Sequence, residues 1–409
     1  MHNHILKFLL SLLLLPFIIT AAAPVPSNPY FSWKTLSQAK SSFAISNVST
    51  TANQCIFSNS NNSVVFNRGS RKATINNVTI WLNVAPEVSM PGRKWHISKI
   101  DTDIIALTLR SSSEKNPAPL KIVIDPGHGG DDSGAVSTLK NLCEKDLNLE
   151  LAKRIGDNLR HQGLKVYYTR DRDKTLALSE RSAIARKKKA DLFVSIHANK
   201  ASNTNACGVE TFVLTPSGYH GTAQGSPPRG WQIGNINDYN NNLLGYCIQK
   251  ELTKEPLNVD RGLKRQSFFV LRETHCPAVL IETGFLSNTD DALRMKTEEW
   301  KSDCSSKISA GILAYCRKVK SLNQAVAAKR RNEAQANQRW RDHLAQKKVE
   351  RERAATPVNI VSNQPEVALK DEIAATNKTS KTISDKHSHK DAPSGLMAIS
   401  DFYRTGKVE

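Results

Sequence analysis

The sequence KIVIDPGHGGDDSGA, residues 121–135, predicts a buried strand that ends in a sharp turn. The apolar run stops at Asp125-Pro126-Gly127, and His128 follows at the carboxyl end of the strand. Ligands of open α/β sheets bind along this edge. A lone histidine is more often a structural or polar surface residue than a ligand, so His128 needs support from other elements.

Two further elements supply that support. Residues 190–196, ADLFVSI, predict a second strand, which ends directly before His197. Glu144 opens a predicted amphipathic helix, so its carboxylate lies in the first turn and can reach the same sheet edge. Two histidines and a glutamate are the protein ligands of an open zinc site, in which a fourth position remains for water. The set indicates hydrolysis.

The fourth candidate is Glu282, which lies inside the apolar run AVLIETGFLSN at residues 278–288. A buried glutamate costs several kcal/mol unless it is paired or has a chemical task. Acting as a general base beside a metal site would be such a task. The alternative is a strand-end glutamate that binds a backbone amide or an arginine.

Residues 120–320 alternate between strand and helix patterns, and we expect them to form the catalytic domain. The alternation predicts an α/β fold, a mostly parallel sheet with helices on both faces. The predicted strands are 121–125, 165–169, 191–196, 208–214 and 278–283, and the predicted helices are 144–161, 178–189, 240–254 and 304–319.

The same segment resembles the zinc-dependent N-acetylmuramoyl-L-alanine amidases. The shared motifs, in order, are DPGHGGDDSGA, EKDLNL at 144–149, TRD at 169–171 with Asp173 and Arg181, SIHAN at 195–199 and ETGFLSN at 282–288. The resemblance implies hydrolysis of the amide between N-acetylmuramic acid and the L-alanine of the peptidoglycan stem peptide, in cell-wall remodelling or daughter-cell separation.

The resemblance also implies Zn²⁺ as the cofactor. His128, Glu144 and His197 match the family's zinc ligands, and Glu282 matches its catalytic glutamate. We expect Asn199 and Arg181 to brace the sheet rather than to bind substrate.

Residues 1–23 have the features of a secretory signal peptide: Lys7 near the start, an apolar run over 8–19, and Ala21-Ala22-Ala23. We therefore expect an exported protein of the periplasm or cell envelope, with an uncleaved membrane anchor as the alternative. Export argues against nucleic acid as a partner.

Residues 24–119 are rich in Ser and Asn and contain short β-type runs at 63–66, 72–75, 78–84 and 104–109. They predict a small β-rich N-terminal domain with a linker. An irregular spacer is the alternative.

The net charge of +19 predicts an acidic partner. Residues 321–355 carry nine Lys or Arg against four Asp or Glu, so we expect a solvated basic helix that binds anionic wall or membrane material. Residues 356–409 are polar and predict a disordered tail.

Two other functions compete with the amidase. Ser137 and Lys140 have the S-x-x-K spacing of penicillin-binding acyl-transfer enzymes, although this spacing occurs three times in the chain and no K-T-G partner follows. A non-catalytic peptidoglycan-binding protein would lack a ligand or Glu282, and none is lacking.

The seven cysteines are an odd number for an exported protein, and their pairing does not follow from the sequence. Cys143 precedes Glu144, and we expect it to pack rather than to bind zinc.

The last feature is the segment 215–238, TPSGYHGTAQGSPPRGWQIGNIND. In some amidases of the family this region holds an inhibitory helix with an acidic side chain at the metal. Five glycines and three prolines oppose a helix here, since each interior proline costs about 3 kcal/mol. We expect a flexible loop beside the cleft, with Tyr219 and Trp231 available to substrate, and an enzyme that needs no activator. His220 as an extra metal ligand is the alternative.

Overall fold

The computed structural model describes residues 31–355 except 90–93, 113, 115–117, 119, 138, 140–141, 224–225, 227–228 and 255–258. The predicted signal peptide, 1–23, and the predicted tail, 356–409, lie outside the described residues. The chain divides into two compact units between Ser321 and Leu322. Within the described part, none of the helices combines the length and apolar character needed to cross a membrane.

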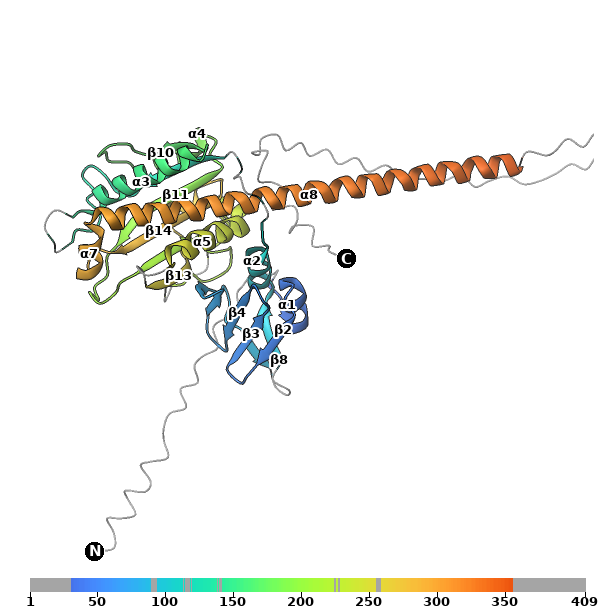
Figure 1. Cartoon of the computed structure of the whole chain (residues 1–409), viewed down its shortest axis with the longest axis horizontal. Coiled ribbons are helices and arrows are strands. Elements are labelled where there is room, and N and C mark those ends of the chain that lie inside the picture. Colours follow the sequence, from blue (N-terminus) through green and yellow to red (C-terminus); the bar gives the residue numbers. More distant parts are fainter. Residues whose placement is uncertain are drawn as a thin grey trace, which may run out of the picture. The chain divides into compact units, whose positions relative to one another are not determined.

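The segment at 120–320 is built on six strands in the order β10-β9-β11-β14-β12-β13. Figure 1 labels β10, β11, β14 and β13 among them. Their bounds are β9 Lys121–Pro126, β10 Lys165–Tyr168, β11 Leu192–Asn199, β12 Val209–Val213, β13 Asp260–Arg265 and β14 Ala278–Phe285. All neighbours in this order are parallel except β14 and β12, which are antiparallel.

The strands of the N-terminal region continue the same sheet. They are β2 Asn47–Thr50, β3 Gln54–Ser58, β4 Ser63–Asn67, β5 Lys72–Ile75 and β6 Val78–Trp81. β6 joins β13 where Ile80 pairs with Leu263, and the strands from β2 to β6 form an antiparallel meander. A separate sheet contains β1 Trp33–Thr35, β8 Lys94–Ser98 and β7 Glu87–Ser89.

The predicted α/β fold is thus present, but the sheet is mixed rather than mostly parallel. Antiparallel neighbours are as frequent as parallel ones once the meander and the β14–β12 pair are included. The prediction concerned residues 120–320, where four of the five neighbouring pairs are parallel. It missed the antiparallel β14–β12 pair and the joining of the N-terminal strands to the same sheet, because local patterns mark a strand without its direction or its partner.

Helices cover both faces of the sheet. Val123, Phe193 and Leu280 form a core on one face with Ala185 of α4 (Leu178–Lys187) and Leu271 of α6 (Phe269–Arg272). On the other face, α5 (Asp238–Leu252) lies so close that a Cβ on its Gly245 would be 2.6 Å from Leu263. The remaining helices are α1 Leu36–Phe43, α2 Lys99–Leu109, α3 Glu144–His161, η1 Ile233–Asn237, α7 Thr289–Met295 and α8 Glu298–Ala355.

One sequence prediction differs from these elements, and one strand within residues 120–320 was not predicted. Residues 104–109 were expected to be a strand, yet they end helix α2, which begins where Ser98 accepts a hydrogen bond from the Asp101 amide. Ser98 caps the helix, and Asp101 is an acidic residue in its first turn. These helix-start signals decided the structure of the segment, although its apolar residues alternate as in a strand. The second difference is β13, DRGLKR, which had no prediction because Leu263 is its one large apolar residue.

Candidate active site

The structure brings the three predicted metal ligands together. His128 follows β9, His197 lies in β11, and Glu144 is the first residue of α3. One donor atom from each lies within 4.8 Å of the others. Glu144 Oε1 is 3.1 Å from His128 Nε2 and 2.9 Å from His197 Nδ1. Donors of a tetrahedral zinc site, with bonds of about 2.0–2.1 Å, lie roughly 3.3 Å apart, so the set fits zinc.

His128 is held in an uncommon backbone conformation. Its φ of 60° lies in the left-handed region, which costs a non-glycine residue free energy unless neighbours enforce it. Arg181 of α4 enforces it by donating to the His128 carbonyl at 2.9 Å and to Asp125 Oδ1 at 2.8 Å. The bracing role expected for Arg181 is confirmed, and both members of this ion pair are buried.

Asp132 orients the imidazole of His128 and was not predicted from the sequence. Its Oδ2 is 2.8 Å from His128 Nδ1, which leaves Nε2 facing Glu144. Histidines that bind metals commonly donate their second nitrogen to such a carboxylate. The signal was present in the GGDDSGA motif, but spacing alone does not say which acid meets the ring.

Two glycines leave room for the cluster. A Cβ on Gly127 would lie 2.2 Å from Cε1 of His197, and a Cβ on Gly134 would lie 2.5 Å from Oε2 of Glu144. Any larger residue would displace the donor groups themselves. Gly127 and Gly134 are therefore required by the approach of the donor side chains.

The carboxylate of Glu144 is fixed by several donors. The amides of Ala135 and Ala198 donate to Oε2 and Oε1 at 2.7 Å and 3.1 Å. Burial alone would raise the pKa of Glu144, but its hydrogen bonds and charge interactions with the two histidines outweigh burial and lower that pKa. The side chain is therefore ionised at neutral pH, as a metal ligand must be.

Glu282 lies beside this cluster. It pairs with His197 in the parallel ladder between β11 and β14, so both side chains leave the sheet on the same face. Its Oε2 is buried and has no hydrogen-bond partner among the described residues. Burial is the largest cause that raises the pKa of Glu282 well above its usual range, and repulsion from Glu144 and Glu210 adds to the rise. The positive charge of Lys264 opposes it. The alternative reading, in which Glu282 binds an arginine or a backbone amide, finds no contact among the described residues.

The other sequence candidates lie outside the cluster. Among the described residues, the metal-binding group contains neither Cys143 nor His220. All seven cysteines are free thiols, and burial raises the pKa of Cys247 to about 12, which makes that thiol unreactive. Ser137 is buried and accepts a hydrogen bond from the Leu139 amide, while Lys140 lies outside the described residues.

The loop at 215–238 does not lie where the sequence suggested. β12 is antiparallel to β14, so Glu210 pairs with Glu282 and Phe212 pairs with Leu280. The loop after β12 therefore starts beside the amino end of β14, at the end of the sheet opposite the candidate metal site. Tyr219 is buried there, and His220 Nδ1 is 2.9 Å from the Ser226 carbonyl. The prediction of a loop beside the cleft was wrong because it assumed that β12 was parallel.

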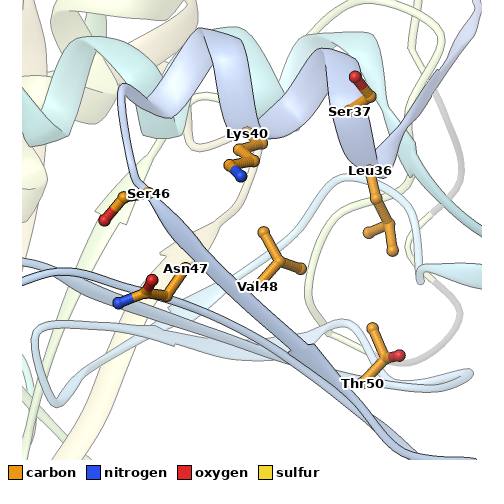
Figure 2. A pocket seen from close by; sticks show the side chains of 7 residues that line it. All are labelled: Leu36, Ser37, Lys40, Ser46, Asn47, Val48 and Thr50. Carbon is orange, nitrogen blue, oxygen red and sulfur yellow. The ribbon is translucent and has the colours of Figure 1, made fainter.

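A hollow in the N-terminal region lies between α1 and β2 (Figure 2). Figure 2 shows Lys40 on the helix above Asn47 and Val48 of the strand. The lining offers no imidazole, carboxylate or thiol, and its residues are Leu36, Ser37, Lys40, Ser46, Asn47, Val48 and Thr50. It has no group suited to the chemistry of the His128 cluster.

Comparisons with known proteins identify a matching domain family and several relatives. The domain family described as N-acetylmuramoyl-L-alanine amidase matches residues 122–314. The uncharacterized protein YqiI of Bacillus subtilis is 36% identical over 52% of this chain and 93% of its own length. N-acetylmuramoyl-L-alanine amidase LytC of the same organism is 35% identical over 50% of this chain, which spans only 37% of LytC.

A solved structure, N-acetylmuramoyl-L-alanine amidase AmiC2 of Nostoc punctiforme, is 31% identical to this chain. The match covers 49% of this chain and 98% of that one, with a TM-score of 0.41.

Proposed function

Since this chain belongs to the N-acetylmuramoyl-L-alanine amidase family, we propose that it hydrolyses the amide between N-acetylmuramic acid and the L-alanine of the peptidoglycan stem peptide. The observation that carries the proposal is the meeting of His128, Glu144 and His197 beside Glu282. Within the described ranges, Oε2 of Glu282 has no hydrogen-bond partner. Cell-wall remodelling or daughter-cell separation is the process that such cleavage serves.

His128, Glu144 and His197 would hold a zinc ion. When bound, zinc acts as a Lewis acid that polarises a carbonyl and acidifies water. The protein supplies two imidazoles and one carboxylate, and a zinc site with three protein ligands keeps a fourth position for water or substrate. Asp132 fixes the ring of His128, and the amides of Ala135 and Ala198 fix the carboxylate of Glu144.

Glu282 would act as the general base and then as the general acid. Its unpartnered Oε2 takes the proton from the attacking water and delivers it to the nitrogen of the leaving alanine. Such a shuttle contributes roughly a hundred- to ten-thousand-fold in rate. The raised pKa suits the task because a carboxyl group that titrates closer to neutrality can both accept and release the proton.

The protein would act in the periplasm or cell envelope, with 1–23 as its export signal. The basic segment from Leu322 to Ala355 would add affinity for anionic wall or membrane material. From Lys329 to Arg353 its side chains are exposed, and they include Trp340, Lys347 and Lys348.

The test is to incubate the purified chain with muropeptides, with and without a metal chelator, and to identify the products. We expect free peptides that begin with L-alanine, and we expect their release to stop with the chelator and to return with Zn²⁺. Cleavage that persists without metal would contradict the zinc assignment. A covalent β-lactam adduct lost in Ser137→Ala would instead favour the acyl-enzyme reading.

A further inference from the structure

A β-bulge lies two strands from Glu282, in β13, the strand that the sequence did not predict. Val209 of β12 pairs with Asp260, and the next residue, Glu210, pairs with Gly262, so Arg261 is an extra residue in β13. Gly262 has a φ of 93°, which suits glycine. Bulges beside active sites re-aim a side chain that regular alternation would send to the wrong face.

The bulge brings Arg261 to a buried carboxylate. Arg261 Nε donates to Glu210 Oε2 at 2.8 Å, and Lys264 Nζ forms an ion pair with the same oxygen. Residues 261 and 264 would leave opposite faces of a regular strand. Because both contact one oxygen of Glu210, the extra residue has placed the two cations on one face.

This charge cluster is tied to the active site on two sides. Asn199, two residues after His197, donates to Glu210 Oε1 at 2.9 Å. Glu210 also stands directly opposite Glu282 in the antiparallel pair, where facing Cβ atoms are about 5 Å apart. A buried ion pair contributes little net stability but fixes geometry. The cluster carries two positive charges against one negative, so it keeps one positive charge near Glu282.

Arg261 is the member that can reach a ligand. Glu210 is 3% exposed, while the side chain of Arg261 is 31% exposed and lies over the ring of Phe285 at 4.6 Å. Only its Nε is used within the described residues, so both terminal nitrogens can donate outward. A guanidinium fixed in this way is preorganised for a bidentate contact with a carboxylate.

The N-terminal region holds the bulge from the other side. The Thr79 amide donates to Asp260 Oδ2 at 2.6 Å, and Trp81 Nε1 donates to the Arg261 carbonyl at 3.3 Å. A Cβ on Gly262 would lie 2.7 Å from Cγ2 of Thr79. The bulge is therefore fixed by β6 as well as by β12.

We propose that Arg261 is a substrate-binding residue that holds a free carboxylate of the stem peptide, on the residue that follows the scissile alanine. This assignment rests on the proposed amidase function. Glu210 and Asn199 act as positioning residues, and Lys264 keeps the charge of Glu210 neutralised. The enzyme would then select peptides whose second residue carries a carboxylate over peptides in which that group is a carboxamide.

The test uses the full chain, loaded with zinc, and two N-acetylmuramoyl peptides that differ only in this group, carboxylate or carboxamide. For the unaltered chain we expect the KM of the carboxylate peptide to be roughly 10–100-fold lower, the usual effect of a hydrogen bond to a charged group. Arg261→Gln should raise that KM until the two peptides become equivalent, with kcat much less affected. Arg261→Lys should recover part of the preference.

Arg160→Gln is the matched control, because Arg160 also lies over an aromatic ring, that of Tyr168 at 5.0 Å, and pairs with Asp157, but at the other end of α3. It should keep the full preference.

Equal KM values for the two peptides with the unaltered chain would overturn the proposal while leaving the amidase function intact. A preference for the carboxylate peptide that survives in Arg261→Gln would overturn it as well. If Arg261→Gln does not fold, the ratio of the two KM values in the unaltered chain and in Arg261→Lys still tests the proposal. Failure of the unaltered chain to cleave either peptide would instead refute the proposed function.

Discussion

His197 and Glu282 stand side by side in neighbouring parallel strands, but their side chains differ in their hydrogen bonds. His197 Nδ1 contacts Glu144 at 2.9 Å, whereas Oε2 of Glu282 has no hydrogen-bond partner in the part of the chain that the structure describes. His197 thus belongs to the candidate metal site, whereas Glu282 is the residue that would transfer protons in the proposed reaction. The division leads to a direct prediction about which substitutions remove zinc.

We expect His128→Ala and His197→Ala to lose zinc, because each removes one of three donor groups. Glu282→Ala should keep zinc and lose turnover by roughly a hundred- to ten-thousand-fold, since it removes the proton shuttle. Metal content measured on purified variants, together with muropeptide cleavage, separates the two effects. A Glu282→Ala protein without zinc would mean that a ligand and the base have been confused.

Asp132→Asn should weaken zinc binding by about 10–100-fold while the fold remains intact, because the carboxylate that orients His128 is lost. Competition with a chelator of known affinity measures this change. Asp131→Asn is the control, since Asp131 interacts with Thr175 rather than with a histidine. Equal affinities in the two variants would show that Asp132 does not tune the site.

The pH dependence of catalysis should reveal the environment of Glu282. The base must be deprotonated, so activity rises as pH passes upward through its pKa. Burial and the nearby carboxylates Glu144 and Glu210 raise that pKa. We therefore expect the acid limb of kcat/KM well above about 4.3, the value for an exposed glutamate. An acid limb that stays near pH 4 would show that Glu282 ionises as an exposed carboxyl group does.

The extent of sequence-based prediction follows from what local patterns encode. Helix α3 matches the predicted 144–161, since apolar spacing and an acidic first turn are local signals. The direction of β12 and its pairing with both β14 and β13 are set by distant segments, so the sequence could not supply them. Glu210 was missed although it gave the same signal as Glu282, a charge within an apolar strand.

Anionic material should bind to the basic segment at 329–353 in a salt-dependent manner. The attraction is screened within about 10 Å at 0.1 M salt, so binding to isolated cell-wall sacculi should fall steeply as salt rises. A truncation after Lys320 should bind less at low salt and still cleave small muropeptides. Full-length protein with Lys347, Lys348, Arg351 and Arg353 changed to Gln should show part of the same loss. Equal binding by the truncated and intact proteins at low salt would refute the role of the segment.

The loop at 215–238 now yields a different expectation from the one its composition suggested. It begins at the sheet edge opposite Glu282, and Arg71 of the N-terminal region donates to the carbonyls of His220 and Gly221 at 2.9 Å and 2.8 Å. Tyr219 is 4% exposed, so the loop contributes to packing between the two regions. Replacing residues 218–235 with a short Gly-Ser linker should therefore lower the melting temperature without raising turnover.

Arg71→Gln tests the same contact with a single substitution. It removes two hydrogen bonds to the loop and one to the Leu82 carbonyl, so we expect a loss of stability of about 1–3 kcal/mol, measured by denaturant unfolding. Cleavage of muropeptides at a temperature where the variant is folded should equal that of the unaltered chain. A large rise in turnover in either variant would contradict this expectation and would mean that the loop restrains the active site. Because the loop begins at the end of the β12–β14 pair away from Glu282, such a restraint would have to act through movement of the sheet.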